Sequence, residues 1–132
     1  MNKTFHVFVY GTLRQHEPNH YLLKKAKCLA RQCWTYGVLY DTGFRYPAMV
    51  SGTKQRVYGE LYEVNEDQLK RLDWLEGYEG EGMANEYDRI IQTVYTDSGT
   101  VQAYMYVYSP EKVTTLTEIK SGDWKCHKLS KE

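Results

Sequence analysis

The chain has 132 residues, with 17 basic and 17 acidic side chains and a formal net charge of zero. This balance gives no electrostatic reason to expect nucleic acid or an anionic membrane surface as a partner. Hydrophobic residues make up 42% of the chain, and no run approaches the roughly 18 apolar residues of a membrane-spanning helix. We expect a single domain over residues 1–132, and, since no secretory signal precedes the first predicted strand, a cytoplasmic location.

The most informative segment is the first predicted strand, residues 5–10, and the turn that follows it. An apolar and aromatic run ends abruptly at Gly11-Thr12, which is how a buried strand turns its backbone amides toward a pocket. Successive N–H groups in such a turn can bind a carboxylate or an oxyanion. The same residues are also consistent with a plain strand end, at which the Thr12 hydroxyl satisfies its own backbone.

The next segments predict a short helix from about residue 19 and two long strands. Residues 28–41 and 56–64 are rich in β-branched and aromatic side chains, and the second segment alternates residue by residue. Each contains one glycine, Gly37 and Gly59. Glycines inside long strands favour tight curvature, as in a small barrel rather than a flat sheet.

One helix has clear signals at both ends. Asn65 can cap its N-terminus, and Gln68 three residues later can return the hydrogen bond. Gly77 is the residue expected just past a helix C-terminus. These signals predict a helix over residues 66–76.

Glu76 is the candidate catalytic residue on that helix. At 3.6 residues per turn it shares one stripe with Leu69, Leu72 and Asp73. Burial, the helix dipole and repulsion from Asp73 would each raise its pKa, which makes a carboxylate a better base near neutral pH. The alternative is a surface glutamate at a helix end, or a structural ion pair such as one with Arg89.

Two further strands are predicted at about residues 86–96 and 101–109, joined by an Asp-Ser-Gly-Thr turn. The tail, residues 110–132, is polar and mixed, and we expect Asp123-Trp124 to anchor it rather than to join a site. The core would then span about residues 5–109. The predicted fold is α+β: a small closed or partly closed mixed β-barrel with flanking short helices.

The cysteines and histidines indicate neither a metal site nor a disulfide framework. Three cysteines without a C-x-x-C pair are expected to be free thiols used as small hydrophobic residues. The four histidines show no ligand spacing with them. A Cys–His nucleophilic pair stays open, although no local sequence supports it. The residues concerned are Cys28, Cys33, Cys126, His6, His16, His20 and His127.

An ordered set of short motifs, taken together, resembles the γ-glutamylcyclotransferase-like superfamily, which includes γ-glutamylamine cyclotransferase and the avirulence-induced-gene-like proteins. The match spans about residues 5–109 in the right order and spacing. The motifs are Val7-Phe8-Val9-Tyr10-Gly11-Thr12-Leu13-Arg14, Asn19-His20 with Leu22-Leu23, Val57-Tyr58-Gly59-Glu60-Leu61-Tyr62, Leu72-Asp73-Trp74-Leu75-Glu76-Gly77, Tyr87-Asp88-Arg89 and Ala103-Tyr104-Met105-Tyr106-Val107-Tyr108.

The resemblance implies a compact β-barrel flanked by helices and an intramolecular acyl transfer. A γ-glutamyl amide closes on itself to give 5-oxoproline and a free amine, with no cofactor and no metal. Glu76 corresponds to the family's catalytic glutamate and would act as general acid and base. The substrate-binding residues that it implies are Tyr10, Gly11, Thr12 and Leu13 in the first turn, Tyr87 and Arg89 in the following strand, and Tyr108 at the pocket wall.

Two other classes of function stay open at this point. The fold could serve as a non-catalytic module that binds or senses a small molecule, although the retained acid argues against it. A nucleic-acid-binding barrel that uses the many tyrosines would need a basic stripe, which the sequence lacks. We expect a small γ-glutamyl compound as the partner, no nucleic acid or membrane, and a monomer or homodimer.

Overall fold

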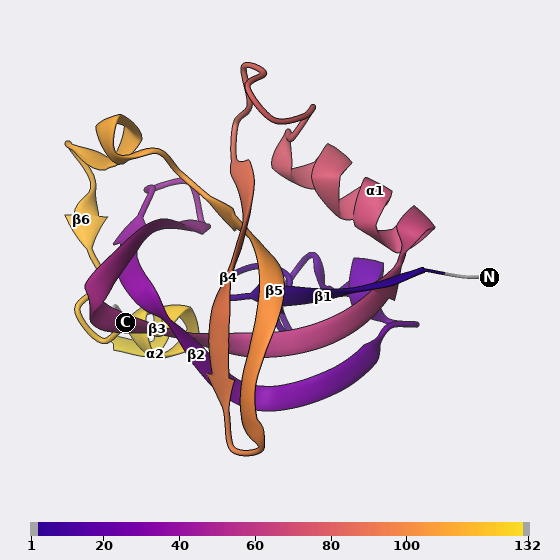
Figure 1. Cartoon of the computed structure of the whole chain (residues 1–132). Helices are drawn as coiled ribbons and strands as arrows, with labels where there is room; N and C mark the ends of the chain where they lie inside the picture. Colours follow the sequence, from indigo (N-terminus) through magenta and orange to yellow (C-terminus); the bar gives the residue numbers. More distant parts are fainter. Residues whose placement is uncertain (1–2, 131–132) are drawn as a thin grey trace.

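A computed structural model describes residues 3–130 as strands wound around a core, with short helices outside (Figure 1). The strands are β1 (Thr4–Val9), β2 (Lys27–Asp41), β3 (Pro47–Asn65), β4 (Asp88–Thr96), β5 (Gly99–Val107) and β6 (Thr117–Glu118). The α-helices are α1 (Glu66–Glu76) and α2 (Trp124–Ser130), and the 3-10 helices are η1 (His20–Leu23) and η2 (Pro110–Val113).

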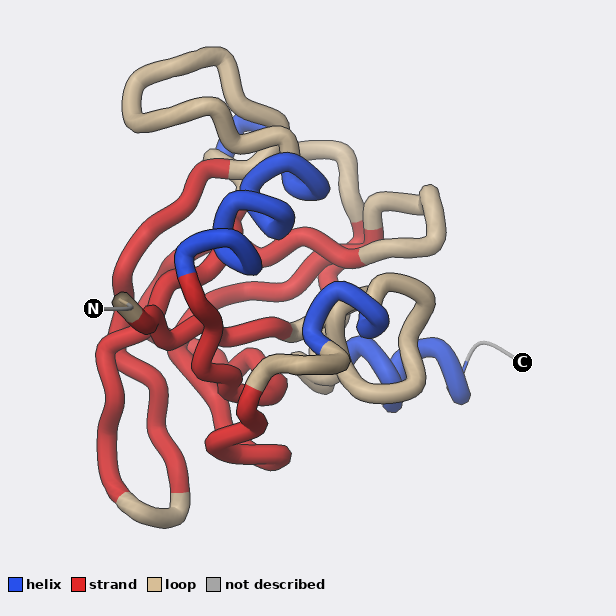
Figure 2. The backbone as a smooth tube through the Cα atoms, turned by 90° about the vertical axis from the view of Figure 1, so that its right-hand side faces the viewer, coloured by secondary structure: helices blue, strands red, loops and turns tan. Residues whose placement is uncertain are grey.

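The six strands form one sheet that curls into a partly closed ring. Their order is β3-β1-β5-β4-β2-β6, and β2 also pairs with β3, so the sheet returns to its own edge. The β1–β5 contact is parallel, and β2 meets β4 through the single pair Trp34–Tyr95. Figure 2 shows the strands gathered in the middle with helices and loops around them. The predicted α+β class with a partly closed barrel is confirmed.

The two strand glycines lie where another stretch of backbone comes close: a Cβ atom at Gly37 would lie 2.8 Å from the carbonyl oxygen of Val50. A register shift in the β2–β3 ladder falls between Tyr36 and Gly37, as in a β-bulge. At Gly59, a Cβ atom would collide with the carbonyl oxygen of Val9 and with the Phe8 ring. Close backbone approach therefore explains the glycine at both places.

The helix predicted over residues 66–76 is present with both its caps. The Asn65 side chain accepts a hydrogen bond from the Gln68 amide at 2.8 Å, and the Gln68 side chain accepts one from the Asn65 amide at 2.8 Å. Gly77 ends the helix with φ 67°. Leu69 and Leu72 are buried, so this face packs on the core and brings the last turn of α1 beside the ring.

Elsewhere the structure differs from the expected boundaries. The strand predicted over 56–64 begins at Pro47, because its first half pairs with β2. The helix expected from residue 19 is one 3-10 turn, in which only Leu23 is buried. The chain beyond residue 109 adds η2, β6 and α2, and its Ile119 and Trp124 are buried. Among residues 3–130, no helix is both long enough and apolar enough to span a bilayer.

Candidate active site

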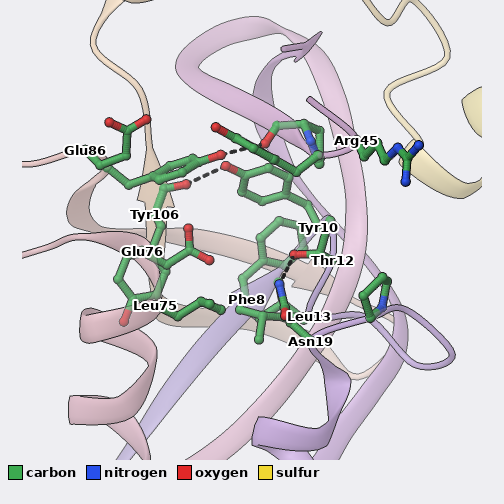
Figure 3. A pocket seen from close by; sticks show the side chains of 16 residues that line it. Phe8, Tyr10, Thr12, Leu13, Asn19, Arg45, Leu75, Glu76, Glu86 and Tyr106 are labelled. Carbon is green, nitrogen blue, oxygen red and sulfur yellow. Dashed lines mark hydrogen bonds between the residues drawn. The ribbon is translucent and has the colours of Figure 1, made fainter. Parts of the chain in front are cut away.

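A cavity of about 440 Å³ opens between the end of β1 and the end of α1 (Figure 3). Glu76 points into it from the helix side, and the turn after β1 forms the facing wall. The cavity is lined by residues 8–13, Pro18 and Asn19, residues 45–47, Leu75 and Glu76, and Glu86, Tyr87 and Tyr106. Its size is within the usual range for small-molecule sites.

In the turn after β1 the backbone carbonyl groups are paired, whereas the backbone N–H groups are left free to donate hydrogen bonds. The carbonyl oxygens of residues 11–13 all accept hydrogen bonds from within the loop: from the Arg14 amide at 3.0 Å, the Asn19 amide at 2.9 Å and His20 Nδ1 at 3.0 Å. Among the described residues no hydrogen bond is donated by the amides of residues 11–13. Such unpaired N–H groups suit a bound carboxylate or a developing oxyanion.

Gly11 and Thr12 each have a local structural reason in this turn. A Cβ atom at Gly11 would lie 2.7 Å from Cγ of Pro47, which lines the same cavity. The Thr12 hydroxyl accepts a hydrogen bond from Nδ2 of Asn19 at 2.9 Å. The threonine therefore binds the far side of the loop rather than its own backbone, and the turn is held closed.

A buried carboxylate on β3 fixes the residues that follow the turn. Glu60 is 4% exposed and accepts hydrogen bonds from Arg14 Nε at 3.1 Å, the Gln15 amide at 2.8 Å and the Tyr62 hydroxyl at 2.8 Å. A buried charge paired in this way is costly to leave alone. Glu60 therefore anchors the loop that carries the candidate anion site.

The C-terminal segment reinforces the same loop from outside. Asp123 accepts a hydrogen bond from Arg14 at 3.0 Å, and Lys125 donates one to the carbonyl of Gln15. Glu17 accepts hydrogen bonds from Trp124 Nε1 at 3.2 Å and from Lys128. The expected anchoring role of Asp123-Trp124 is confirmed, and the element that the segment anchors is the wall of the cavity.

Glu76 has the perturbed acidity that its position on the helix predicted. Burial, and to a smaller extent the negative charge of Glu86, raise its pKa to about 7. The expectation that Asp73 repels Glu76 is wrong, because the charge that acts on Glu76 is that of Glu86. Asp73 instead accepts hydrogen bonds from Arg89 at 2.7 Å and from the Tyr106 hydroxyl at 2.6 Å. Arg89 neutralises Asp73, and the like charge that acts on Glu76 comes from across the loop.

Arg89 and Tyr108 do not line the cavity, unlike the other residues expected to bind substrate. Arg89 forms an ion pair with Asp73. Its guanidinium carbon lies 4.5 Å from the centroid of the Tyr104 ring. Its ion pair is therefore with Asp73 and not with Glu76. The Tyr108 hydroxyl donates a hydrogen bond to Glu86 at 2.8 Å, so this residue touches the site through another side chain.

Tyr10 and Tyr87 line the cavity, but their hydroxyl protons are used inside the protein. Tyr10 donates to the carbonyl of Tyr106 at 2.6 Å and accepts from the Met49 amide at 3.1 Å. Tyr87 donates to the carbonyl of Pro47 at 2.8 Å. Burial raises the pKa of both phenols, so they remain protonated and serve as rigid walls.

Several residues of the cavity were not predicted. Glu86 directly precedes the Tyr87-Asp88-Arg89 motif, and Tyr106 lies in a segment, residues 104–108, in which every second residue is tyrosine. A sequence signal was therefore present but ambiguous. Arg45 belongs to an irregular loop in which nothing indicated a site. Within residues 3–130 there is no group of three or more His, Cys, Asp or Glu side chains that could hold a metal ion, and the three thiols are free.

The comparison with known protein families identifies the chain. The family model described as gamma-glutamyl cyclotransferase, AIG2-like, matches residues 7–126. The chain belongs to this family. The match includes the turn after β1, the Glu76 helix and most of the C-terminal segment, so it covers every part of the cavity described above.

Relatives of this gamma-glutamyl cyclotransferase family protein agree with the assignment. The gamma-L-glutamyl-butirosin B gamma-glutamyl cyclotransferase of Niallia circulans is 43% identical over 124 residues, which cover 93% of this chain and 77% of that one. YkqA from Bacillus subtilis has a crystal structure with a TM-score of 0.78 and 35% identity, which covers 99% of this chain and spans 42% of that longer one. A mouse AIG2-like protein gives a TM-score of 0.66 at 28% identity over 84% of this chain and 83% of that one.

Proposed function

We propose that the protein is a cyclotransferase that releases a free amine from a γ-glutamyl amide and converts the glutamyl part to 5-oxoproline. The observation that carries the proposal is the arrangement of two groups around one cavity. The Glu76 carboxylate, with a pKa near 7, and the amide-rich turn after β1 line the same space of about 440 Å³. This pairing supplies a proton acceptor and an oxyanion site to one bound molecule.

The chemistry requires a proton to leave the α-ammonium group of the substrate before its nitrogen can attack. Glu76 in its ionised form accepts that proton, and the amine then forms a bond to the γ-carbonyl carbon. The bond to the leaving nitrogen breaks, and Glu76 returns the proton to the departing amine. A carboxyl with a pKa near 7 can act in both directions near neutral pH.

The turn after β1 acts on the carbonyl that is attacked. As the tetrahedral intermediate forms, its oxygen gains negative charge, which the unpaired amides of residues 11–13 can stabilise. The anchors at Glu60 and Asp123 hold these donors in place before the reaction begins. Since the attack is intramolecular, the cavity has only to keep the glutamyl chain folded back on itself.

The direct test measures 5-oxoproline released from a panel of γ-glutamyl amides by the wild type and by Glu76→Gln. We expect the substitution to reduce the rate by 10²-fold or more, which is the usual contribution of a general base. Glu81→Gln is the matched control, because Glu81 is exposed in the loop after α1 and lines no part of the cavity.

The result also separates catalysis from binding alone. A protein that binds glutamate-like ligands tightly but yields no product would be a binding module on this fold. Full activity in Glu76→Gln would show that another group removes the proton. Loss of product with unchanged ligand affinity in Glu76→Gln is the outcome that supports the proposed role.

A further inference from the structure

A second hollow adjoins the candidate active site on the outside of α1. It has a volume of about 360 Å³ and lies between η1 and α1, which pack side by side. Its walls are Tyr21 and Leu22 on one side and Lys70, Arg71, Trp74 and Leu75 on the other. We refer to these six residues as the η1–α1 groove.

The groove shares one wall residue with the cavity that contains Glu76. Leu75 lines both spaces, and in Figure 3 its side chain extends from the helix beside Glu76 toward the turn after β1. In the proposed reaction the leaving nitrogen must reach the Glu76 carboxyl to receive its proton. A substituent on that nitrogen would then lie close to Leu75, which precedes Glu76 on α1 and offers a way toward the groove.

The surface of the groove has two properties that bear on its occupant. Trp74 is 84% exposed and Tyr21 is 66% exposed, an unusual display of two large aromatic rings beside one hollow. The charged side chains are both positive. Lys70 has an exposed ion pair with Glu66 at 3.7 Å, and Arg71 is exposed, with no carboxylate partner among residues 3–130. The groove is therefore apolar, aromatic and cationic.

We propose that the η1–α1 groove is the subsite for the amine part of the substrate. It would select γ-glutamyl amides whose leaving amine carries an aromatic or apolar side chain and a carboxylate. Trp74 and Tyr21 would pack on the side chain, and Arg71 would pair with the carboxylate. This inference rests on the proposed cyclotransferase function and adds to it the chemistry of the leaving group.

The opposite end of the cavity offers a competing route for the leaving group. Arg45 lies there, on the far side of the cavity from Leu75 (Figure 3). Glu86 also lines the cavity, and its negative charge would repel a carboxylate that leaves past it. A carboxylate on the leaving amine would therefore be attracted more by Lys70 and Arg71 in the groove. The variant Arg45→Ala tests the other route.

The test uses two substrates that differ only in one carboxylate: γ-glutamylphenylalanine and the γ-glutamyl amide of phenethylamine. We expect the wild type to favour the first in kcat/KM by about 1.5- to fivefold, the range for an exposed ion pair. Arg71→Ala should bring this ratio close to one, mainly by lowering kcat/KM for the first substrate. Arg31→Ala is the matched control, since Arg31 is exposed on β2 and lines neither hollow.

A second variant tests the aromatic part of the subsite. Trp74→Ala should lower kcat/KM for both aromatic substrates several-fold relative to γ-glutamylglycine, whose amine part has no side chain to pack. A ratio that is unchanged in Arg71→Ala, or that is lost in Arg45→Ala instead, would overturn the subsite while the cyclotransferase function stands. Absence of 5-oxoproline from these three substrates, with release from other γ-glutamyl amides of the panel, would also overturn the subsite alone, and release from none of the panel would overturn both.

Discussion

Glu86 is held beside Glu76 by the backbone at the two ends of the loop between α1 and β4. The Glu86 amide donates to the carbonyl of Gly77 at 3.0 Å, and the Tyr87 amide donates to the carbonyl of Glu76 at 3.1 Å. Ten residues of chain thus leave the helix and return to it. As a result a second carboxylate lines the cavity and raises the pKa of the first.

The first prediction concerns the pH dependence of the reaction. Glu76 must be ionised to accept a proton, so kcat/KM should rise with pH through about 7. Glu86→Gln removes a negative charge that raises the pKa of Glu76, and a lower pKa makes the base available in more acidic solution. We therefore expect the rising limb of the pH–rate profile to move to lower pH, with little change in its plateau.

The control for this shift is Glu81→Gln, which removes a charge of the same sign from the same loop at an exposed position. Its profile should coincide with that of the wild type, because Glu81 does not line the cavity and the charge that raises the pKa of Glu76 is that of Glu86. A limb that moves to higher pH in Glu86→Gln, or that does not move, would contradict the electrostatic link between the two carboxylates.

The second prediction is a gain in stability when the proposed catalytic group is removed. The pKa of Glu76 rises from 4.5 in the unfolded chain to about 7 in the folded protein. Between these values the folded state binds more protons, so its free energy of unfolding falls as the pH rises. Glu76→Gln should therefore be more stable than the wild type by roughly 3 kcal/mol at pH 8.

Urea unfolding at pH 4.5 and at pH 8 checks this second prediction. At pH 4.5 the Glu76 side chain of the folded wild type is protonated and, like glutamine, carries no charge. The free energies of unfolding of the variant and the wild type should therefore differ little at this pH. The difference should grow steadily up to pH 7 and then level off. A glutamine variant that is less stable by the same amount at both pH values would mean that Glu76 is not strained by its surroundings.

The sequence allowed α1 and its catalytic candidate to be predicted because their signals are local. Asn65, Gln68 and Gly77 define the helix ends within a few residues, and the spacing of Leu69 and Leu72 defines the buried face. Burial of that face carries Glu76 toward the core, so its raised pKa also follows from short-range information.

The rest of the site depends on contacts between distant segments, which no local pattern contains. Glu86 reaches the cavity only because its loop returns to Gly77. Arg89 pairs with Asp73 and not with Glu76, which depends on how β4 lies beside α1 in the folded chain. The role of Asp123 in holding Arg14 spans 109 positions of the chain, so a polar tail gave no reason to expect it beside the site.

The third prediction follows from the close approach at Gly77. This residue has φ 67°, and a Cβ atom there would lie 2.8 Å from Cβ of Glu86. Gly77→Ala should cost about 1–2 kcal/mol for the left-handed backbone alone. It should also displace Glu86, and so shift the pH–rate limb in the same direction as Glu86→Gln.

Gly82→Ala provides the comparison for Gly77. Gly82 has φ 78° in the same loop, but a Cβ atom there meets nothing within 4 Å. It should therefore lose a similar amount of stability through its backbone and leave the pH profile unchanged. Identical profiles for the two alanine variants would show that Glu86 does not depend on the packing at Gly77.

The fourth prediction concerns the carboxylate that anchors the turn after β1. Glu60→Ala leaves the Arg14 guanidinium, the Gln15 amide and the Tyr62 hydroxyl without their shared partner. Removal of one member of a buried ion pair should cost about 3–5 kcal/mol in the free energy of unfolding. In protein that remains folded, the loosened amides should bind the glutamyl group less well, so KM should rise.

Glu63→Ala on the same strand separates anchoring from a general loss of charge. Glu63 lies three residues along β3, outside the cavity lining, and its substitution should change stability by about 0.5 kcal/mol or less. Unfolding in urea and steady-state kinetics at low temperature give the two readouts for each variant. If Glu60→Ala lost stability but kept its KM, the carboxylate would support the fold without positioning the amides. A joint loss would mean that the buried charge shapes the cavity as well as the core, because the loop it anchors forms one wall of that cavity.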